Sequence, residues 1–182
     1  MALDVSDAVR GKIAALCEKL RAEFPSARWV RSEGIHVTLK FIGEVAEERV
    51  ARIEEAIAAV QSDGGVEMNF RGSGFFPDER RPRVFWIGID STPNLAEIAG
   101  QIEARLESFG IARETREFRP HLTLARIAEW RGIGKLRDAL RRNGSVEFGA
   151  VGTTEMHLYR SELGREGPKY SRLKTFTFIR TS

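Results

Sequence analysis

The sequence reads His36-Val37-Thr38-Leu39 in its first quarter and His121-Leu122-Thr123-Leu124 in its second half, two copies of one short pattern. Successive side chains of a β-strand point to opposite faces, so the histidine and the threonine of each copy share one face. The apolar side chains of each copy occupy the other face, as in a half-buried strand. Two of the three histidines of the chain occur in this pattern. The sequence therefore predicts two equivalent strands that contribute to one paired site.

The two copies belong to a longer internal repeat. A shift of 86 residues aligns Asp90 with Asp4, and a shift of 85 aligns the two histidines. The apolar positions that match at the shift of 86 are Val9 with Leu95, Ile13 with Ala99, Leu16 with Ile102 and Leu20 with Leu106. With changes in loop length the correspondence continues, and it matches Val50 with Ile133, Ile53 with Leu136 and Ile57 with Leu140. We therefore predict a single domain over 1–182 made of two interleaved, pseudo-symmetric lobes, with a first repeat over about 1–76, a second over about 84–160 and closing strands within 155–180. The counterpart of Val84 would precede Met1, so we expect the opening strand to be shortened.

Hydrophobic periodicity predicts the elements of each repeat. We expect strands over residues 2–5, 29–30, 35–42, 66–76, 84–90, 146–148, 155–159 and 170–179, with a turn over 163–168. Ser6 is placed to cap a helix that runs to about Phe24, and the matched apolar series predict three further helices. Two lobes of this kind, each a sheet backed by helices, would pack with their bare sheet faces around a central cleft.

Composition excludes several classes of protein. The 182 residues, 42% hydrophobic and 30% charged, suit a globular chain with a real core. A net charge of +3 is too small for a general nucleic-acid coat but allows a local anion-binding patch. We expect neither a membrane span nor a signal peptide, because no apolar run is long enough and residues 1–10 lack the charge pattern. The single Cys17 is expected to fill core space in a monomeric, cytoplasmic protein.

Paired histidines across a cleft indicate acid–base chemistry. A histidine pKa near 6.5 allows one ring to act as general base and the other as general acid at neutral pH. The hydroxyls of Thr38 and Thr123 are short donors suited to the non-bridging oxygens of a phosphodiester. Such a site would direct an in-line attack of water at phosphorus without a metal or another cofactor. The sequence alone leaves open which histidine is the acid.

Other interpretations of the same residues stay open. His157 could join the motif histidines in a three-histidine zinc site, although the chain lacks clustered ligand spacing. The cleft could bind RNA or a nucleotide without turnover, or both histidines could be structural. A serine or cysteine nucleophile has no support, since the chain lacks a Gly-x-Ser-x-Gly elbow and Cys17 lies in an apolar helical segment.

The motifs and their surroundings resemble the 2H phosphoesterases, and within them the bacterial and archaeal RNA 2′,3′-cyclic phosphodiesterases once called 2′-5′ RNA ligases. The resemblance covers nearly the whole chain and is carried by residues 2–5, 29, 35–45, 83–86, 119–126, 158–161 and 167–170. It implies an α+β, two-lobed LigT-like fold with pseudo-two-fold duplicated antiparallel sheets, backed by helices, around a central cleft. It also implies that a 2′,3′-cyclic phosphate at an RNA end is opened to a 2′-phosphomonoester, and reversible 2′-5′ ligation of RNA ends is chemically available at the same site.

Carried over residue by residue, the resemblance makes His36 the proton donor and His121 the proton acceptor. It also implies that Arg126 contacts the phosphate or the neighbouring nucleotide. Strict alternation would turn Arg126 away from His121, so it must lie at the strand end or past a bulge. One departure is Gly34-Ile35, where the family commonly has Asn before the first motif histidine.

Several further residues near the motifs are candidates for substrate binding. Phe41 follows the first motif on the core-facing parity, so it either packs in the core or stacks on a base of the substrate. Four basic residues could follow an RNA backbone or remain solvated: Lys40, Arg81, Arg83 and Arg119.

Overall fold

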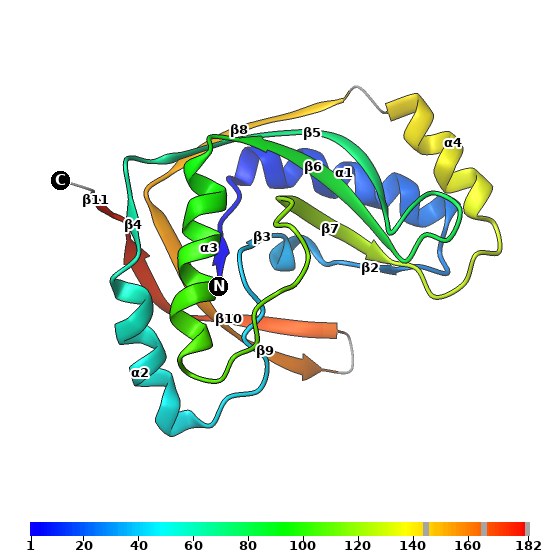
Figure 1. Ribbon diagram of the computed structural model, residues 1–182. Helices are drawn as coiled ribbons and strands as arrows, with labels where there is room; N and C mark the ends of the chain where they lie inside the picture. The colour runs from blue at the N-terminus through cyan, green and yellow to red at the C-terminus, as the bar shows by residue number, and fades with distance from the viewer. Residues whose placement is uncertain (144–145, 165–166, 181–182) are drawn as a thin grey trace.

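The computed structural model describes residues 1–143, 146–164 and 167–180, which form two antiparallel sheets and four α-helices (Figure 1). The four-stranded sheet has the order β10-β9-β1-β3, built from β1 (Ala2–Leu3), β3 (Val37–Thr38), β9 (Glu155–Gly164) and β10 (Gly167–Thr177). The five-stranded sheet has the order β2-β7-β6-β5-β8, built from β2 (Arg28–Trp29), β5 (Val66–Phe76), β6 (Val84–Ser91), β7 (His121–Arg126) and β8 (Glu147–Thr153). A separate parallel pair joins β4 (Gln61–Ser62) to β11 (Ile179–Arg180). The α+β class with duplicated antiparallel sheets is confirmed.

The first helix begins and ends close to its predicted position, and the three further helices contain the predicted apolar series. They are α1 (Asp7–Glu23), α2 (Glu47–Ala58), α3 (Asn94–Glu107) and α4 (Ile133–Asn143), with a short 3₁₀ helix η1 (Ser32–Gly34) before the first motif. Ser6 caps α1 as predicted, since its hydroxyl accepts a hydrogen bond from the Val9 N–H at 3.4 Å. Ile13 and Cys17 lie on the buried face of this helix. Burial raises the pKa of the Cys17 thiol to about 11.

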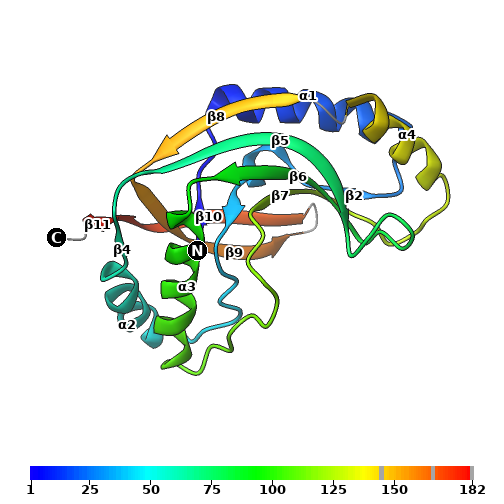
Figure 2. The same cartoon turned by 45° about the horizontal axis from the view of Figure 1, so that its top comes forward.

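The two repeats exchange helices between the sheets. Helix α1 of the first repeat lies against β8 and α4, and α4 also contacts β5. In Figure 2 this helix pair covers the outer side of the five-stranded sheet, while β9 and β10 lie on the opposite side. Helix α3 of the second repeat packs against α2, which lies against β10 of the four-stranded sheet. Each lobe therefore contains elements of both repeats.

The predicted strand over residues 35–42 is wrong in its length. Only β3 (Val37–Thr38) forms a ladder with β1, which is itself two residues long. Immediately after β3, the N–H groups of Leu39 and Lys40 both donate to the Met1 carbonyl, at 2.9 and 3.3 Å. The short partner limits the ladder, so most of the predicted strand has no neighbour to pair with.

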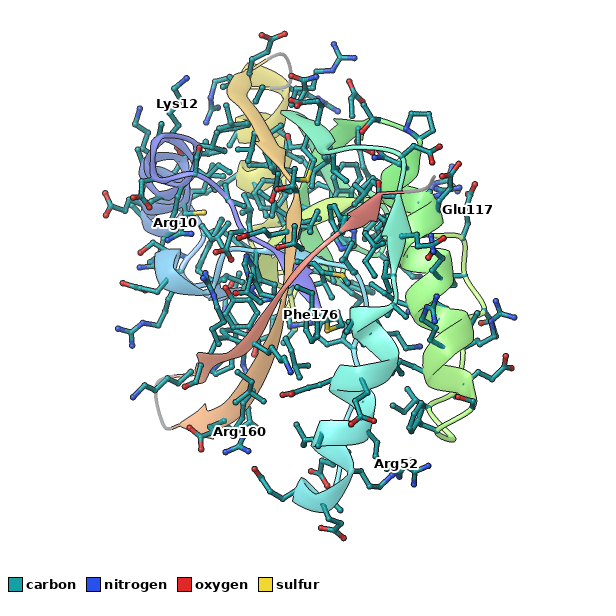
Figure 3. The ribbon with its side chains drawn as sticks, turned by 90° about the vertical axis from the view of Figure 1, so that its left-hand side faces the viewer. Arg10, Lys12, Arg52, Glu117, Arg160 and Phe176 are labelled. Carbon is teal, nitrogen blue, oxygen red and sulfur yellow. The ribbon has the colours of Figure 1, made fainter. Side chains whose placement is uncertain are left out.

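The closing strands are longer than predicted. β9 and β10 pair from Glu155 with Thr177 to Gly164 with Gly167, so the expected turn over 163–168 is largely strand. Residues 165 and 166 of that turn lie outside the described residues. In the described part of the chain, no helix is both long and apolar enough to span a membrane. A single apolar cluster joins the helices and both sheets, and Figure 3 shows one of its members, Phe176 of β10, in the interior.

Candidate active site

The two histidine motifs lie side by side although they belong to different sheets. Cα atoms of β3 and β7 approach within 8 Å of one another, and Figures 1 and 2 both show the two strands as neighbours. His36 and Thr38 are half-buried while Val37 and Leu39 are buried, and β7 repeats this alternation. The predicted strand parity is therefore correct in both motifs. The structure therefore brings together the two strands that carry the four predicted polar side chains.

His121 is held in an orientation that suits a proton acceptor. Its Nδ1 lies 2.7 Å from the carbonyl oxygen of Arg119, two residues earlier. A carbonyl can only accept, so Nδ1 carries the proton and the neutral ring keeps its lone pair on Nε2. The edge of the Phe76 ring packs against the imidazole, with ring centroids 4.9 Å apart at 83°. These two contacts hold the ring, and within the described part of the chain no side chain or backbone group is found bonded to Nε2, which can therefore take a proton.

His36 is held between the two tyrosines of the chain. Tyr159 stacks on the imidazole, with centroids 5.8 Å apart at 16°, and Tyr170 meets it edge-on at 4.8 Å. Burial lowers the pKa of His36, and the N-terminal ammonium group acts in the same direction. The charge of Asp4 and a hydrogen bond to the backbone of Gly34 oppose this shift in the His36 pKa. Both motif histidines thus bond to the backbone two residues earlier, at Gly34 and Arg119.

A charged cluster lies behind the His36 ring. The Tyr159 hydroxyl donates to Asp4 Oδ1 at 2.6 Å, and the Arg172 guanidinium pairs with Asp4 Oδ2. Arg172 also donates to the Tyr159 hydroxyl at 3.2 Å. Burial and the neighbouring Asp4 raise the pKa of Tyr159, which therefore stays a hydrogen-bond donor at neutral pH. The cluster fixes the ring on which His36 stacks.

Sequence reasoning did not assign roles to Asp4, Tyr159, Tyr170 or Arg172. Asp4 and Tyr159 lie 155 positions apart and meet only through the pairing of β1 with β9. Two signals were present: both tyrosines fall in segments that carry the family resemblance, and Tyr159 shares its strand parity with His157. Neither signal places an aromatic ring against His36 without the three-dimensional fold.

His157, the third histidine, is buried close to the site. It pairs in register with Ala2, as does Thr38, so these side chains share one face of the four-stranded sheet. Its Nδ1 lies 3.0 Å from the Thr175 hydroxyl, and its Nε2 lies 3.6 Å from an Asp4 oxygen. Among the described residues, no group of three His, Cys, Asp or Glu side chains is placed to hold a metal ion. The zinc interpretation therefore finds no ligand set in this part of the chain.

A bulge in β7 sets the direction of Arg126. Thr123 and Ala125 pair with consecutive residues of β6, so Leu124 between them has no partner. Leu124 and Ala125 are both buried, which shifts the alternation by one residue. Arg126 therefore lies on the same face as Thr123, at the exposed end of the strand. The prediction that this arginine reaches the motif face through a bulge or at the strand end agrees with the structure on both counts.

Glycines in β5 make room for a tryptophan beside the second motif. Trp86 of β6 pairs with Thr123 on one side and with Gly74 on the other. Its ring lies over Gly74, where a Cβ atom would fall 2.5 Å from Cζ2. The same ring packs against Phe76, with centroids 5.1 Å apart. Gly74 thus lets Trp86 pack beside Phe76, and these two rings form an aromatic support next to His121, which Phe76 contacts.

Two candidates from the first motif have clear positions. Phe41 is 69% exposed, so the core-packing alternative is wrong and the ring is available to a ligand. Lys40 is only 7% exposed, because its ammonium donates to Glu103 Oε2 and to the Ala112 carbonyl, both at 2.6 Å. Lys40 therefore neither follows an RNA backbone nor remains solvated, since the chain after β3 passes against α3.

The other three basic candidates are exposed. The Arg83 guanidinium lies over the Trp130 ring, 5.4 Å from its centroid. Arg119 pairs with Glu117 at 3.2 Å, and Arg81 is exposed in the loop between β5 and β6. All three lie next to β6 or β7 in the chain, on the lobe that carries Arg126.

Comparison with known proteins places this geometry in a family. The family model for LigT like phosphoesterases matches residues 3–86 and again residues 87–170, in agreement with the internal repeat. An RNA 2′,3′-cyclic phosphodiesterase of Aeropyrum pernix is 38% identical over 90% of this chain and 93% of its own length. A protein of the same name from Archaeoglobus fulgidus is 34% identical over 97% of both chains.

Solved structures show the same fold. A crystal structure of a Thermus thermophilus protein superposes with a TM-score of 0.79, at 26% identity over 100% of this chain and 97% of that one. Escherichia coli LigT complexed with NADP+ gives a TM-score of 0.74, at 25% identity over 98% of this chain and 95% of that one. The repeat and the two sheets agree with these matches, and the chain belongs to the LigT like phosphoesterase family, the 2H phosphoesterases.

Proposed function

We propose that this protein hydrolyses 2′,3′-cyclic phosphate ends of RNA to 2′-phosphomonoesters. The observation that carries the proposal is the adjacency of two His-x-Thr strands from different lobes, with a free Nε2 on His121. Relatives that match along nine-tenths of the chain or more are named RNA 2′,3′-cyclic phosphodiesterases, which supports the same substrate. Both lobes are needed for one site, so we treat the chain as one catalytic unit.

The chemistry is an in-line displacement at phosphorus. Nε2 of His121 takes a proton from water as the water oxygen bonds to phosphorus. The bond between phosphorus and the ribose 3′ oxygen breaks on the opposite side, and His36 donates its proton to that oxygen. Thr38 and Thr123 donate hydrogen bonds to the non-bridging oxygens as negative charge develops. The product is a 2′-phosphate with a free 3′ hydroxyl, and solvent exchange restores both histidines.

The lowered pKa of His36 fits the role of acid. A group with a lower pKa gives up its proton more readily to the departing oxygen. Tyr159 and Tyr170 cover part of the half-buried ring and so limit the access of water to it. The negative phosphate, once bound, favours the protonated form of the imidazole.

Arg126 and Phe41 extend the site toward the RNA. Arg126 shares the motif face of β7, so we assign it to the phosphate or to the neighbouring nucleotide. The exposed ring of Phe41 is assigned to stacking on a base of the RNA chain. Ligation at the same site would use an RNA 5′ hydroxyl in place of water: the 5′ oxygen bonds to phosphorus, the bond to the 3′ oxygen breaks, and the two ends are joined by a 2′-5′ linkage.

The active unit is assigned as a monomer that works in the cytoplasm. One chain supplies both motif strands, so the site needs no residue from a second copy. The one cysteine, Cys17, is buried as a thiol, which suits a reducing compartment. Sedimentation of the purified protein tests the assigned monomer directly.

One experiment tests the proposed reaction. Purified protein is incubated with EDTA and an oligoribonucleotide that ends in a 2′,3′-cyclic phosphate, and the product end is identified by NMR. We expect turnover to a 2′-phosphate at the rate seen without EDTA, and loss of turnover in His36→Ala and His121→Ala. Loss of the rate with EDTA and recovery with zinc would instead favour a metal site. A mobility shift of the RNA without turnover would favour a binding module, and a 3′-phosphate product would reverse the histidine roles.

A further inference from the structure

Asp4 faces His36 across the four-stranded sheet. β1 and β3 pair in antiparallel register, with Leu3 opposite Val37. The same register, continued by one residue past the end of β1, sets Asp4 opposite His36 on one face of the sheet. The two side chains also line one cavity of about 420 Å³. A carboxylate is therefore a neighbour of the proposed acid.

A glycine takes the corresponding place beside the proposed base. The internal repeat aligns Asp90 with Asp4. β6 and β7, however, pair with Gly88 opposite His121, so Asp90 lies two residues further along the sheet. There it is exposed and pairs with Arg71. The registers of the two repeats differ by two residues, and this difference gives the two histidines different neighbours.

Both oxygens of the Asp4 carboxylate bind other side chains. Oδ1 accepts a hydrogen bond from the Tyr159 hydroxyl at 2.6 Å, and Oδ2 pairs with the Arg172 guanidinium. Arg172 also donates to the Tyr159 hydroxyl oxygen at 3.2 Å, so each of the three groups contacts the other two. Nε2 of His157 lies 3.6 Å from Oδ2. Hydrogen bonds to an ionised group are the stronger kind, so Asp4 anchors the end of the Tyr159 side chain.

Tyr159 connects this anchor to the acid. Its ring stacks on the His36 imidazole, with centroids 5.8 Å apart at 16°. A tyrosine ring that is held at its hydroxyl cannot tilt freely, so the imidazole stacked on it keeps its plane. Tyr170 meets the imidazole edge-on at 4.8 Å, and a Cβ atom on Gly34 would lie 3.3 Å from the Tyr170 ring. The acid is thus held between an anchored ring and a ring packed on η1.

The charge of Asp4 acts on His36 as well. The other ionisable groups around the ring are the chain amino group, two histidines, a tyrosine and two ion pairs: Met1, His157, His121, Tyr170, Asp7 with Arg10, and Glu33 with Arg31. Burial lowers the pKa of His157, and it lowers the pKa of the Met1 amino group to about 5, so both groups are largely neutral at neutral pH. The charges within each ion pair largely cancel. The carboxylate of Asp4 favours the protonated form of His36.

We propose that Asp4 is the positioning residue of the acid: paired with Arg172, it fixes Tyr159 against His36 and supplies the negative charge that favours the donating form of the ring. The proposal rests on the proposed function, specifically on His36 as the proton donor. It gives a physical reason for the direction of proton transfer. The histidine that faces a carboxylate starts protonated, and the histidine that faces a glycine starts neutral.

Asp4→Asn tests the proposal, because it removes the charge and keeps the shape. We measure kcat and KM on an RNA end with a 2′,3′-cyclic phosphate across the pH range. We expect kcat to fall about tenfold or more, as for groups that orient metal-bound histidines, at a KM close to that of wild type. The falling limb of the pH profile should move to lower pH, because the lost carboxylate and the unpaired Arg172 both disfavour the protonated imidazole.

NMR titration of the His36 ring measures the same effect without turnover. The signal is assigned by its loss in His36→Ala, and its midpoint should lie at lower pH in Asp4→Asn than in wild type. Asp90→Asn is the matched control, since it makes the same change at the aspartate that the repeat aligns with Asp4 and also breaks a pair with an arginine. This control should keep the wild-type kcat, pH profile and His36 titration.

Tyr159→Phe separates the anchor from the charge. It removes the hydroxyl but keeps the stacked ring and Asp4. We expect kcat to fall at an unchanged KM, with the falling limb closer to that of wild type than in Asp4→Asn. This variant also tests the positioning role if Asp4→Asn does not fold.

The outcomes separate the two proposals. A wild-type kcat and an unmoved His36 titration in Asp4→Asn would overturn the positioning role, and so would a raised KM at unchanged kcat, which would make Asp4 a substrate contact. A wild-type kcat in Tyr159→Phe would overturn the part of the tyrosine. Failure of the wild-type protein to hydrolyse any cyclic phosphate would overturn the proposed function instead, and the NMR titration would still test the effect of Asp4 on His36.

Discussion

Replacing Gly74 by alanine tests the aromatic support beside the second motif. The added Cβ would lie 2.5, 2.8 and 3.1 Å from three atoms of the Trp86 ring, whereas ordinary contact begins at 3.4 Å. The ring must therefore retreat by about 0.9 Å, against Phe76 on the same face. Inserting a methyl group into packed surroundings costs about 1–3 kcal/mol in unfolding free energy. For a chain of this length, that corresponds to a Tm lower by about 2–12 °C.

Urea unfolding, followed by circular dichroism, measures the cost of Gly74→Ala. We expect a lower midpoint at an unchanged slope, because the extent of folding does not change. Gly100→Ala is the matched control: Gly100 is exposed on α3 with open space around its Cα, so alanine there should add about 0.5–1 kcal/mol. Because Phe76 also touches His121, Gly74→Ala should lower kcat on the RNA end as well.

A double variant tests whether the Trp86 indole ring causes the cost of Gly74→Ala. The three crowded atoms belong to the part of the indole that phenylalanine lacks, so Gly74→Ala should cost much less in a Trp86→Phe background. Wild-type stability of Gly74→Ala, or an equal cost in both backgrounds, would mean that the indole ring does not occupy the space above Gly74.

Four further results are expected. His36→Ala and His121→Ala should each lower kcat by about 10²–10⁴-fold. The double variant should lose far less than the two single losses multiplied together, because the two residues act as a unit. Losses that multiply strictly would contradict a paired acid and base. Because burial lowers the pKa of His36 and the acid must be protonated, kcat/KM should fall as pH rises through a value below the ordinary 6.5 or so; a falling limb above that value would argue against His36 as the acid. Arg126→Ala should lose about 1.5–3 kcal/mol of transition-state stabilisation, measured from kcat/KM. Wild-type kinetics in this variant would mean that Arg126 is a surface residue that does not contact the substrate. Lys40→Ala should cost about 3–5 kcal/mol in urea unfolding by leaving Glu103 unpaired, while the salt dependence of RNA binding stays as in wild type; a smaller salt slope would identify Lys40 as a phosphate contact.

Local patterns predicted the elements that make the site. The predicted alternation of buried and half-buried side chains in His36-Val37-Thr38 is observed although the ladder is only two residues long. Val37 is buried on one face of the strand, so His36 and Thr38 lie on the other face. The bulge before Arg126 was also accessible to reasoning, since two consecutive apolar residues, Leu124 and Ala125, cannot both face the core in an unbroken strand.

Contacts between residues far apart in the sequence could not be predicted from such local patterns. An apolar stripe on α1 shows that the helix buries one face, but it does not show which sheet receives that face. The burial of Lys40 depends on Glu103 of α3, and the support of His36 by Tyr159 depends on the distant Asp4. Each of these contacts joins residues that no local periodicity relates.

The exchange of α1 and α3 between the lobes has a consequence for the origin of the duplication. A chain with only one repeat would expose the apolar face of its first helix, because the sheet that covers this face belongs largely to the other repeat. Two copies of such a chain could each cover the exposed apolar face by exchanging this helix. The result would be a domain-swapped dimer with two-fold symmetry. Its two identical motif strands would then already meet at the symmetry axis. Fusion of the two copies would turn that dimer into one chain and free the two histidine sites to diverge into separate donor and acceptor roles.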